Sequence, residues 1–240
     1  HVLNGILGYP VVYFVSGARS VGFPTPTVAA LVPGLLSMSL FDEGRDLLSK
    51  VHSADSGRIQ TNRFLDVCRL VLQAVDHLGT GFMLVKSDVG GNIDRLARSA
   101  ATNPERYDAD ILVIVEDEVQ AGGAASSSSS TKGLLWLKRA MQFVMALLNR
   151  LTEDEEESLS AAASETYYAT LQQYHGWIVT GTFTVALKLV PARQSFLDSI
   201  GAASPEGLAR MHTFCQEFSV LLLEVHQFLS ENGLDDPAKV

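Results

Sequence analysis

Three polar side chains at helical spacing are the most informative chemical feature of this sequence. Asp88, Asn92 and Arg95 stand at positions i, i+4 and i+7, which places all three on one face of a helix. A carboxylate, an amide and a guanidinium on one face can accept and donate several hydrogen bonds to a single ligand. Trp136, in the later segment 134–139 (LLWLKR), adds a flat aromatic surface on which a sugar ring can stack. The combination suits a polyhydroxylated headgroup.

His175 is a further candidate, in the segment 174–178 (YHGWI). We expect it midway along one long helix over 164–189, where a single histidine is more often a hydrogen-bonded core residue than a ligand. An acid–base pair of Asp88 and His175 is conceivable, but the sequence offers no nucleophile or oxyanion site beside it. No hydrolase elbow, phosphate loop or dinucleotide motif occurs, and no His/Cys pair has metal-ligand spacing. We therefore expect no enzyme, no catalytic residue, no metal and no cofactor.

Charge and composition restrict the remaining classes of function. The 240 residues carry a formal net charge of −9, which argues against nucleic-acid binding and against tight adhesion to anionic membranes. Transient membrane contact stays open. We find no run of 18 or more apolar residues, so no transmembrane helix is predicted. Cys68 and Cys215 are predicted to be core thiols, in keeping with a cytoplasmic protein, and we expect a monomer.

The first 40 residues differ from the rest of the chain. They are apolar, are interrupted by Pro24, Pro26 and Pro33, and lack the pattern of a signal peptide. The sequence begins at His1 rather than Met, which we take to indicate a fragment or a processed chain. We predict an N-terminal extension of uncertain role over 1–40 and a single folded domain over 41–240.

From residue 41 onward, apolar residues recur every three or four positions, which predicts helices. The main predicted helices cover 64–75, 82–101, 135–148, 164–189 and 208–229. The β-branched run 111–115 resembles a strand locally, but it would be almost the only one, so we predict a helix there too. The Gly- and Ser-rich segment 121–131 is predicted to be a flexible loop. Gly90 and Gly91, inside a predicted helix, suggest helix–helix contact or close approach.

Three separated segments, 64–96, 134–139 and 174–179, resemble the glycolipid transfer protein family in order and in residue types. The likeness extends over roughly 41–240 and includes the closing Lys239-Val240. The resemblance implies an all-α, two-layer helical sandwich with an internal apolar lipid pocket. It implies non-enzymatic transfer of glycosphingolipids, such as glucosylceramide or galactosylceramide, between membranes.

The resemblance also implies a role for each polar candidate. Asp88 matches the carboxylate that accepts the ceramide amide N–H and a sugar hydroxyl, and Asn92 matches an amide that binds the sugar. Arg95 stands where many members carry lysine. Trp136 matches the indole under the first sugar, and His175 the imidazole that donates to the ceramide carbonyl.

Further positions follow from the same resemblance. Trp177 is similar to an interfacial tryptophan that contacts the membrane. The residues expected to line the lipid-chain pocket are Phe82, Val85, Phe143, Leu171 and Phe183.

Two positions of the sequence favour a sugar headgroup over a phosphate. Members that bind ceramide-1-phosphate carry arginine where Trp136 stands and a basic residue where this chain has Ala140. The departures from the family are Arg95 in place of lysine, Ala238 where some members have tyrosine, and the serine-rich loop. The alternative hypothesis is a sphingolipid sensor or binding module, including ceramide-1-phosphate transfer, that signals to a protein partner.

Overall fold

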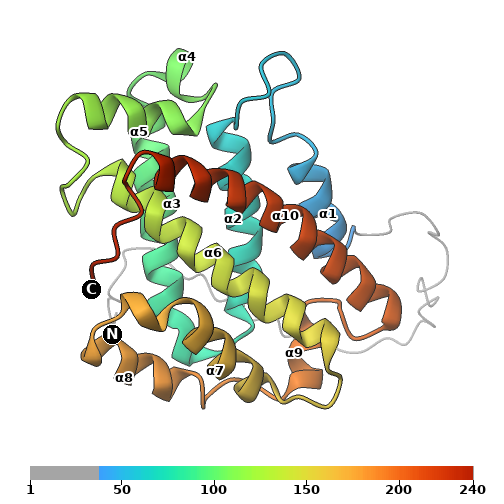
Figure 1. Cartoon of the computed structure of the whole chain (residues 1–240). Helices are drawn as coiled ribbons and strands as arrows, with labels where there is room; N and C mark the ends of the chain where they lie inside the picture. Colours follow the sequence, from blue (N-terminus) through green and yellow to red (C-terminus); the bar gives the residue numbers. More distant parts are fainter. Residues whose placement is uncertain (1–37, 240) are drawn as a thin grey trace, which may run out of the picture. The chain divides into compact units, whose positions relative to one another are not determined.

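The structure, a computed structural model, describes residues 38–239 (Figure 1). Across that range the chain is helical: no strand forms, and a single isolated bridge pairs His52 with Ile59. The prediction of an all-α fold is therefore confirmed. The expected extension 1–40 falls almost entirely outside the described residues, which begin at Met38. The first described helix begins at Leu40. No helix in the described range is long and apolar enough to cross a membrane.

The longer helices are α1 (Leu40–Leu48), α2 (Thr61–Asp76), α3 (Met83–Ala100), α5 (Ile111–Gln120), α6 (Ser130–Glu153), α7 (Leu159–Thr170), α8 (Trp177–Ala186) and α10 (Pro205–Glu231). Shorter pieces join them: η1 (Thr80–Phe82), α4 (Pro104–Tyr107), η2 (Gln172–Tyr174) and α9 (Arg193–Ser199).

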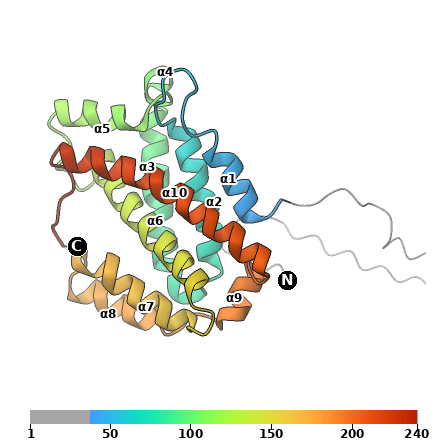
Figure 2. The ribbon, with the colours of Figure 1, turned by 45° about the vertical axis from the view of Figure 1, so that its right-hand side comes forward.

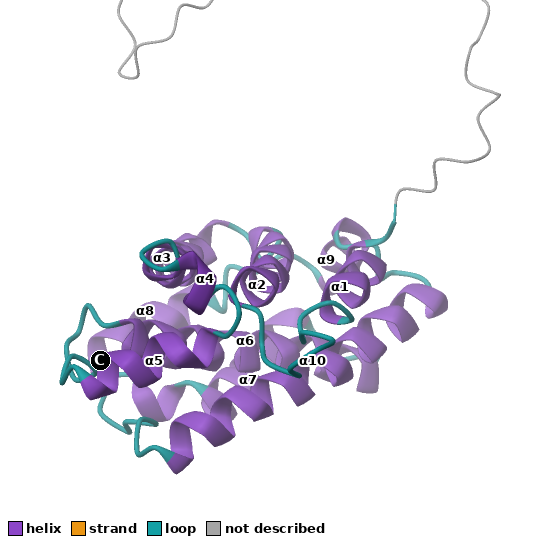
Figure 3. Cartoon of the chain, turned by 90° about the horizontal axis from the view of Figure 1, so that it is seen from above, coloured by secondary structure: helices purple, strands orange, loops and turns teal. Residues whose placement is uncertain are grey.

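The helices pack in two layers. One layer contains α1, α2 and α3 as neighbours, and the other contains α10, α6 and α7; Figure 3 shows the two rows from above. The layers meet where α3 and α2 pack on α6 and where α1 packs on α10. Helix α10 lies beside α6 and runs in the opposite direction (Figures 1 and 2). The two-layer α-helical sandwich predicted above is thus confirmed.

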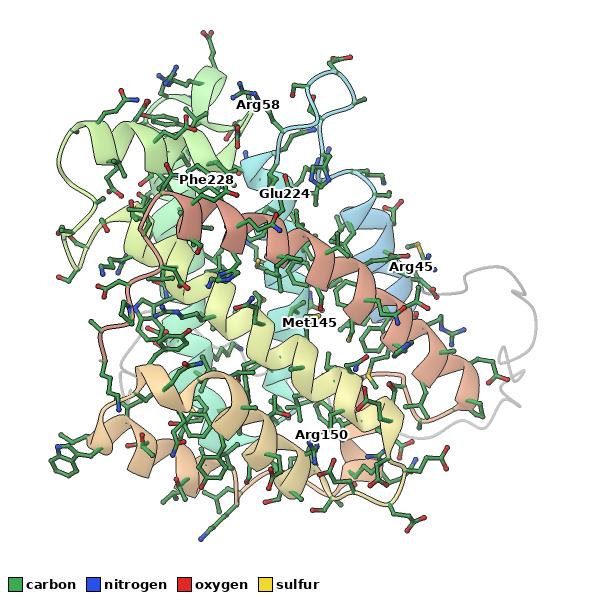
Figure 4. The ribbon with its side chains drawn as sticks, viewed as in Figure 1. Arg45, Arg58, Met145, Arg150, Glu224 and Phe228 are labelled. Atoms are coloured by element: carbon green, nitrogen blue, oxygen red, sulfur yellow. The ribbon has the colours of Figure 1, made fainter. Side chains whose placement is uncertain are left out.

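Helix α6 packs against its neighbours α7 and α10 in its own layer and against α2 and α3 in the other layer. Fifteen of its 24 residues are buried, including Met145 in the middle of the core (Figure 4). Cys68 of α2 and Cys215 of α10 are also buried and free, as predicted. Burial raises the pKa of the Cys215 thiol to about 12 and also raises that of Cys68. Both thiols are therefore inert packing residues.

Helix boundaries confirm some expectations and correct others. The ambiguous run 111–115 lies in α5, which begins where the Asp110 carboxylate accepts the N–H of Leu112. By contrast, the single long helix expected over 164–189 is wrong. The chain leaves the helix after Thr170, His175 is extended with φ −102° and ψ 133°, and α8 starts afresh after Gly176. Glycine's weak helix preference permits this break, and packing of His175 in the interior stabilises it.

The serine-rich loop between α5 and α6 is held more firmly than its composition predicts. The Glu118 carboxylate accepts hydrogen bonds from the N–H groups of Ser130 and Thr131, at 2.9 and 2.7 Å, and thus caps the start of α6. Ser129 caps the same helix through the N–H of Lys132 at 3.0 Å. The predicted loop over 121–131 is thus too long by two residues, because Ser130 and Thr131 already belong to α6. The sequence run alone did not reveal the bonds from Glu118, which lies outside it.

Gly91 gives a test of the fold. A Cβ at Gly91 would meet nothing within 4 Å, and one at Gly90 would lie 3.9 Å from Leu72, so neither glycine is required by close packing. Gly91→Ala should therefore stabilise α3 by about 0.5–1 kcal/mol, measured by urea unfolding. Gly44→Ala is the contrasting control: its Cβ would lie 2.5 Å from Phe214, so it should destabilise. A destabilising Gly91→Ala would contradict this account of α3.

Candidate ligand-binding site

A cavity of about 450 Å³ opens between α3, α6 and α8. It brings together all five polar candidates of the sequence analysis, from three separate parts of the chain: Asp88, Asn92, Arg95, Trp136 and His175. Ser127 adds a polar side chain from the serine-rich loop, and the remaining wall is apolar except for Thr182, whose hydroxyl donates to the Ile178 carbonyl. The site is thus polar at one side and hydrocarbon-lined at the other, which is the arrangement that an amphipathic ligand requires.

The α3 wall behaves as its spacing predicts. Asp88, Asn92 and Arg95 all face the cavity from one side of the helix. Asp88 is exposed at the cavity mouth, yet crowding by surrounding protein atoms raises the pKa of its carboxyl, and the positive charge of Arg95 offsets this only in part. Asn92 is buried, and its amide has no hydrogen-bond partner among the described residues. Both groups are therefore available to a ligand.

Arg95 is engaged with the protein. Its Nη1 donates to the carbonyl oxygens of Ser127 and Ser129, at 3.1 and 3.2 Å. The side chain reaches these carbonyls by passing Gly133, where an added Cβ would lie 3.0 Å from the Arg95 Cδ. Arg95 and the serine-rich loop are therefore connected. The planar guanidinium fixes the loop that forms one edge of the cavity.

Trp136 and His175 form the opposite wall. Their rings are stacked, with centroids 5.9 Å apart and planes 20° apart, and Tyr174 meets Trp136 edge-on at 6.4 Å. This stack exists because the chain breaks its helix at Gly176 and turns His175 inward. Packing between aromatic rings fixes the plane of Trp136, so the indole is a preformed surface.

His175 is buried, and its hydrogen bonding is specific. Its Nδ1 lies 3.0 Å from the hydroxyl of Tyr167, while no described residue bonds its Nε2. Burial lowers the pKa of His175, and the positive charge of Arg139 lowers it further. The ring is therefore neutral at pH 7, with one nitrogen that donates and one that accepts.

The apolar side of the cavity centres on Phe183. Of the five predicted pocket residues, Val85, Leu171 and Phe183 line the cavity, whereas Phe82 and Phe143 lie behind it. Both of these buried rings meet Phe183 edge-on, at 6.1 and 6.3 Å. The five positions are therefore contiguous, but only three touch the cavity itself.

Behind Trp136, a buried charge network joins α6 to the C-terminal segment. Arg139 Nη2 donates to the Asp235 carboxylate at 3.0 Å and to the Asp236 carbonyl at 2.7 Å. Its guanidinium lies over the Tyr174 ring at 3.5 Å and over Trp136 at 5.1 Å. Lys138, also buried, lies 3.3 Å from Asp235. Arg139 therefore supports the aromatic wall from the side away from the cavity.

The comparisons with known proteins agree with this geometry. A family model described as Glycolipid transfer protein (GLTP) matches residues 59–202. Glycolipid transfer protein 1 of Arabidopsis thaliana is 39% identical over 183 residues, which cover 76% of this chain and 90% of that protein. The chain belongs to the glycolipid transfer protein family. Human pleckstrin homology domain-containing family A member 8 is 34% identical over 67% of this chain, but only 33% of that longer protein is matched.

Solved structures show the GLTP fold. A structure of FAPP2, described as selecting simple glycosphingolipids with this fold, superposes with a TM-score of 0.71 at 28% identity, over 86% of this chain and 98% of that one. Mouse ceramide-1-phosphate transfer protein gives a TM-score of 0.75 at 20% identity, over 83% and 99%. At that identity the second likeness concerns the fold alone. The chain is thus a member of a family of lipid transfer proteins.

Sequence reasoning missed three residues around the site. Tyr167, which bonds His175, gave no signal because the predicted long helix placed both on one continuous element. Arg139 and Tyr174 were inside the quoted segments but were passed over, since an arginine in an amphipathic helix usually faces solvent. Tyr174 reaches the ring of Trp136 because α7 ends at Thr170 and the chain continues in the short 3-10 turn η2.

The Asp235 network predicts a large effect on stability. Burial acts to raise the pKa of Asp235, but Lys138 and Arg139 outweigh it and hold the pKa below its usual value. Asp235→Ala should destabilise the fold by about 3 kcal/mol because it leaves two buried cations short of a partner. Glu217→Ala, which breaks the exposed pair with Arg45, should cost at most about 1 kcal/mol. Equal losses in chemical unfolding would contradict the buried network.

The raised pKa of Asp88 predicts that removing its charge increases thermal stability in a pH-dependent way. Because the folded-state pKa lies above the unfolded one, the wild type loses stability as pH rises through it. Asp88→Asn should therefore have a higher Tm than wild type at pH 7, and the gap should close as pH falls toward about 4. Asp94→Asn on the exposed side of α3 measures the general effect of removing a charge. A lower Tm for Asp88→Asn at pH 7 would refute the assignment.

Proposed function

We propose that this protein carries a glycosphingolipid with a small neutral sugar headgroup, such as a monohexosylceramide, between membranes. The proposal rests on one observation above the others: the cavity has a preformed indole on the wall that faces Asp88 and Asn92, and its one lining arginine, Arg95, is bonded through Nη1 to the serine-rich loop. An aromatic face with acceptor and donor groups around it suits a sugar.

The cations near the cavity support sugar over phosphate. Arg95 lines the cavity, but its Nη1 is bonded to two loop carbonyls, and Arg139 lies behind the rings in a bond with Asp235. A phosphate monoester prefers bidentate arginine, and neither of these two guanidiniums is without a protein partner. Trp136 and Ala140, at the two positions where phosphate-binding members are expected to carry basic residues, favour the same conclusion.

The ceramide portion of the ligand fits the facing groups. Asp88 accepts the ceramide amide N–H, and the imidazole of His175 donates to the adjacent carbonyl. An amide buried without these bonds loses about 1–3 kcal/mol for each unpaired group, so the pair distinguishes ceramide lipids from lipids without an amide. The hydrocarbon chains enter past Val85, Leu171 and Phe183. No bond is made or broken, so this function needs no catalyst or cofactor.

Helix α8 supplies the proposed membrane contact. Trp177 is 85% exposed, and Ile178 and Val185 of the same helix, together with Leu189 just after its end, are also largely exposed. Exposed apolar side chains on the same helix that lines the cavity are suited to insertion at a bilayer surface, where a tryptophan prefers the headgroup level. The lipid then passes directly between bilayer and cavity.

Vesicle transfer tests the proposal. The full chain should accelerate movement of labelled glucosylceramide well above its spontaneous rate and leave labelled ceramide-1-phosphate near its spontaneous rate. Asp88→Val removes a charged acceptor from the amide and should lower glucosylceramide binding by about tenfold or more.

Three results would count against the carrier proposal. Faster transfer of ceramide-1-phosphate than of glucosylceramide would overturn the sugar assignment. Tight binding with no transfer would indicate a sensor. Full activity of Asp88→Val would remove Asp88 from the site. Trp177→Ala is the matched control, because it should slow transfer while leaving lipid binding in detergent unchanged.

A further inference from the structure

Tyr167 has no role in the proposed function, although its hydroxyl makes a hydrogen bond with His175. The side chain is fully buried in α7, and its ring is stacked on Phe183 at 4.6 Å with planes 9° apart. Its hydroxyl lies 3.0 Å from His175 Nδ1 and 3.5 Å from Thr180 Oγ1. A buried hydroxyl needs a partner for its proton, so these two distances decide the chemistry of the imidazole.

Two arrangements of protons are possible for the neutral ring. In the first, Tyr167 donates to Nδ1, and the imidazole proton is on Nε2. In the second, Nδ1–H donates to Tyr167, whose own proton must then go to Thr180. Hydroxyl hydrogen bonds fall between about 2.5 and 3.0 Å, and the Thr180 contact of 3.5 Å is well outside that range. The first arrangement alone gives the buried phenolic proton a good acceptor.

From these contacts we infer that Tyr167 is a specificity-determining positioning residue, which holds His175 in the tautomer that carries its proton on Nε2. Building on the proposed function, this tautomer makes His175 a donor and leaves Asp88 as the facing acceptor. An amide, with its adjacent N–H and C=O, is complementary to that donor–acceptor pair. In the opposite tautomer both residues would be acceptors, and the amide carbonyl would meet a lone pair.

Nitrogen NMR of the lipid-free, full-length chain labelled at histidine tests the tautomer directly. In the wild type, His175 should show an unprotonated Nδ1 and a protonated Nε2, its signals being identified by their loss in His175→Gln. Tyr167→Phe keeps the ring and removes only the hydroxyl, so it should give a mixture of both tautomers. Tyr168→Phe, in the exposed neighbour, is the matched control and should leave the wild-type pattern.

Lipid binding supplies a second readout. Tyr167→Phe should weaken glucosylceramide binding by about threefold to tenfold, because part of the population must change tautomer before it can donate. Binding of glucosylsphingosine, which has no acyl carbonyl, should be unchanged. Equal losses for both lipids would mean that Tyr167 is merely structural.

The inference about Tyr167 is overturned if wild-type His175 carries its proton on Nδ1, or if Tyr167→Phe leaves the tautomer unchanged. Failure of the wild type to bind glucosylceramide would instead refute the proposed function. The NMR result on the lipid-free chain would then still decide the role of Tyr167, so the two failures are distinguishable.

Discussion

Arg139 is almost completely buried, and two of its nitrogens, Nε and Nη1, have no hydrogen-bond partner among the described residues. A guanidinium in that state is costly unless other contacts compensate. Here the compensation comes from the Tyr174 and Trp136 rings and from Asp235, so one side chain joins α6, the turn before α8 and the C-terminal segment. Arg139 therefore links the aromatic wall of the cavity to the C-terminal segment.

The positive charge of Arg139 also acts on the site electrostatically. Its charge, together with burial, lowers the pKa of His175, while crowding raises that of Asp88. Each effect disfavours the ionised form of a residue that lines the cavity. The raised pKa of the Asp88 carboxyl and the unpaired Nε2 of His175 do not stabilise the fold. Groups of this kind are typical of binding sites, where a ligand supplies the missing partners. A ligand amide would supply one donor and one acceptor at once.

The sequence was sufficient for the features that depend on local periodicity. The face of Asp88, Asn92 and Arg95 follows from helical geometry alone, and the all-α class follows from the recurrence of apolar residues. What it could not predict was the break at Gly176, since a helix pattern that continues through 164–189 hides a turn stabilised by tertiary packing of His175. Because that turn was not predicted, the contacts of Arg139, Tyr167 and Tyr174 were not predicted either.

The bond between Tyr167 and His175 also bears on how the two halves of the cavity work together. Phe183 lines the apolar side, stacks on Tyr167 and lies 5.3 Å from the ring of His175. Longer hydrocarbon chains than the cavity now accommodates require a ring to move, and Phe82 and Phe143 are fully enclosed. Phe183 is bounded by no hydrogen bond, whereas Tyr167 is held by its hydroxyl. If the protein carries the lipid proposed above, the apolar side would widen by movement of Phe183 while the Tyr167 hydroxyl keeps the imidazole in place. The proposed amide contact would then survive the entry of the chains.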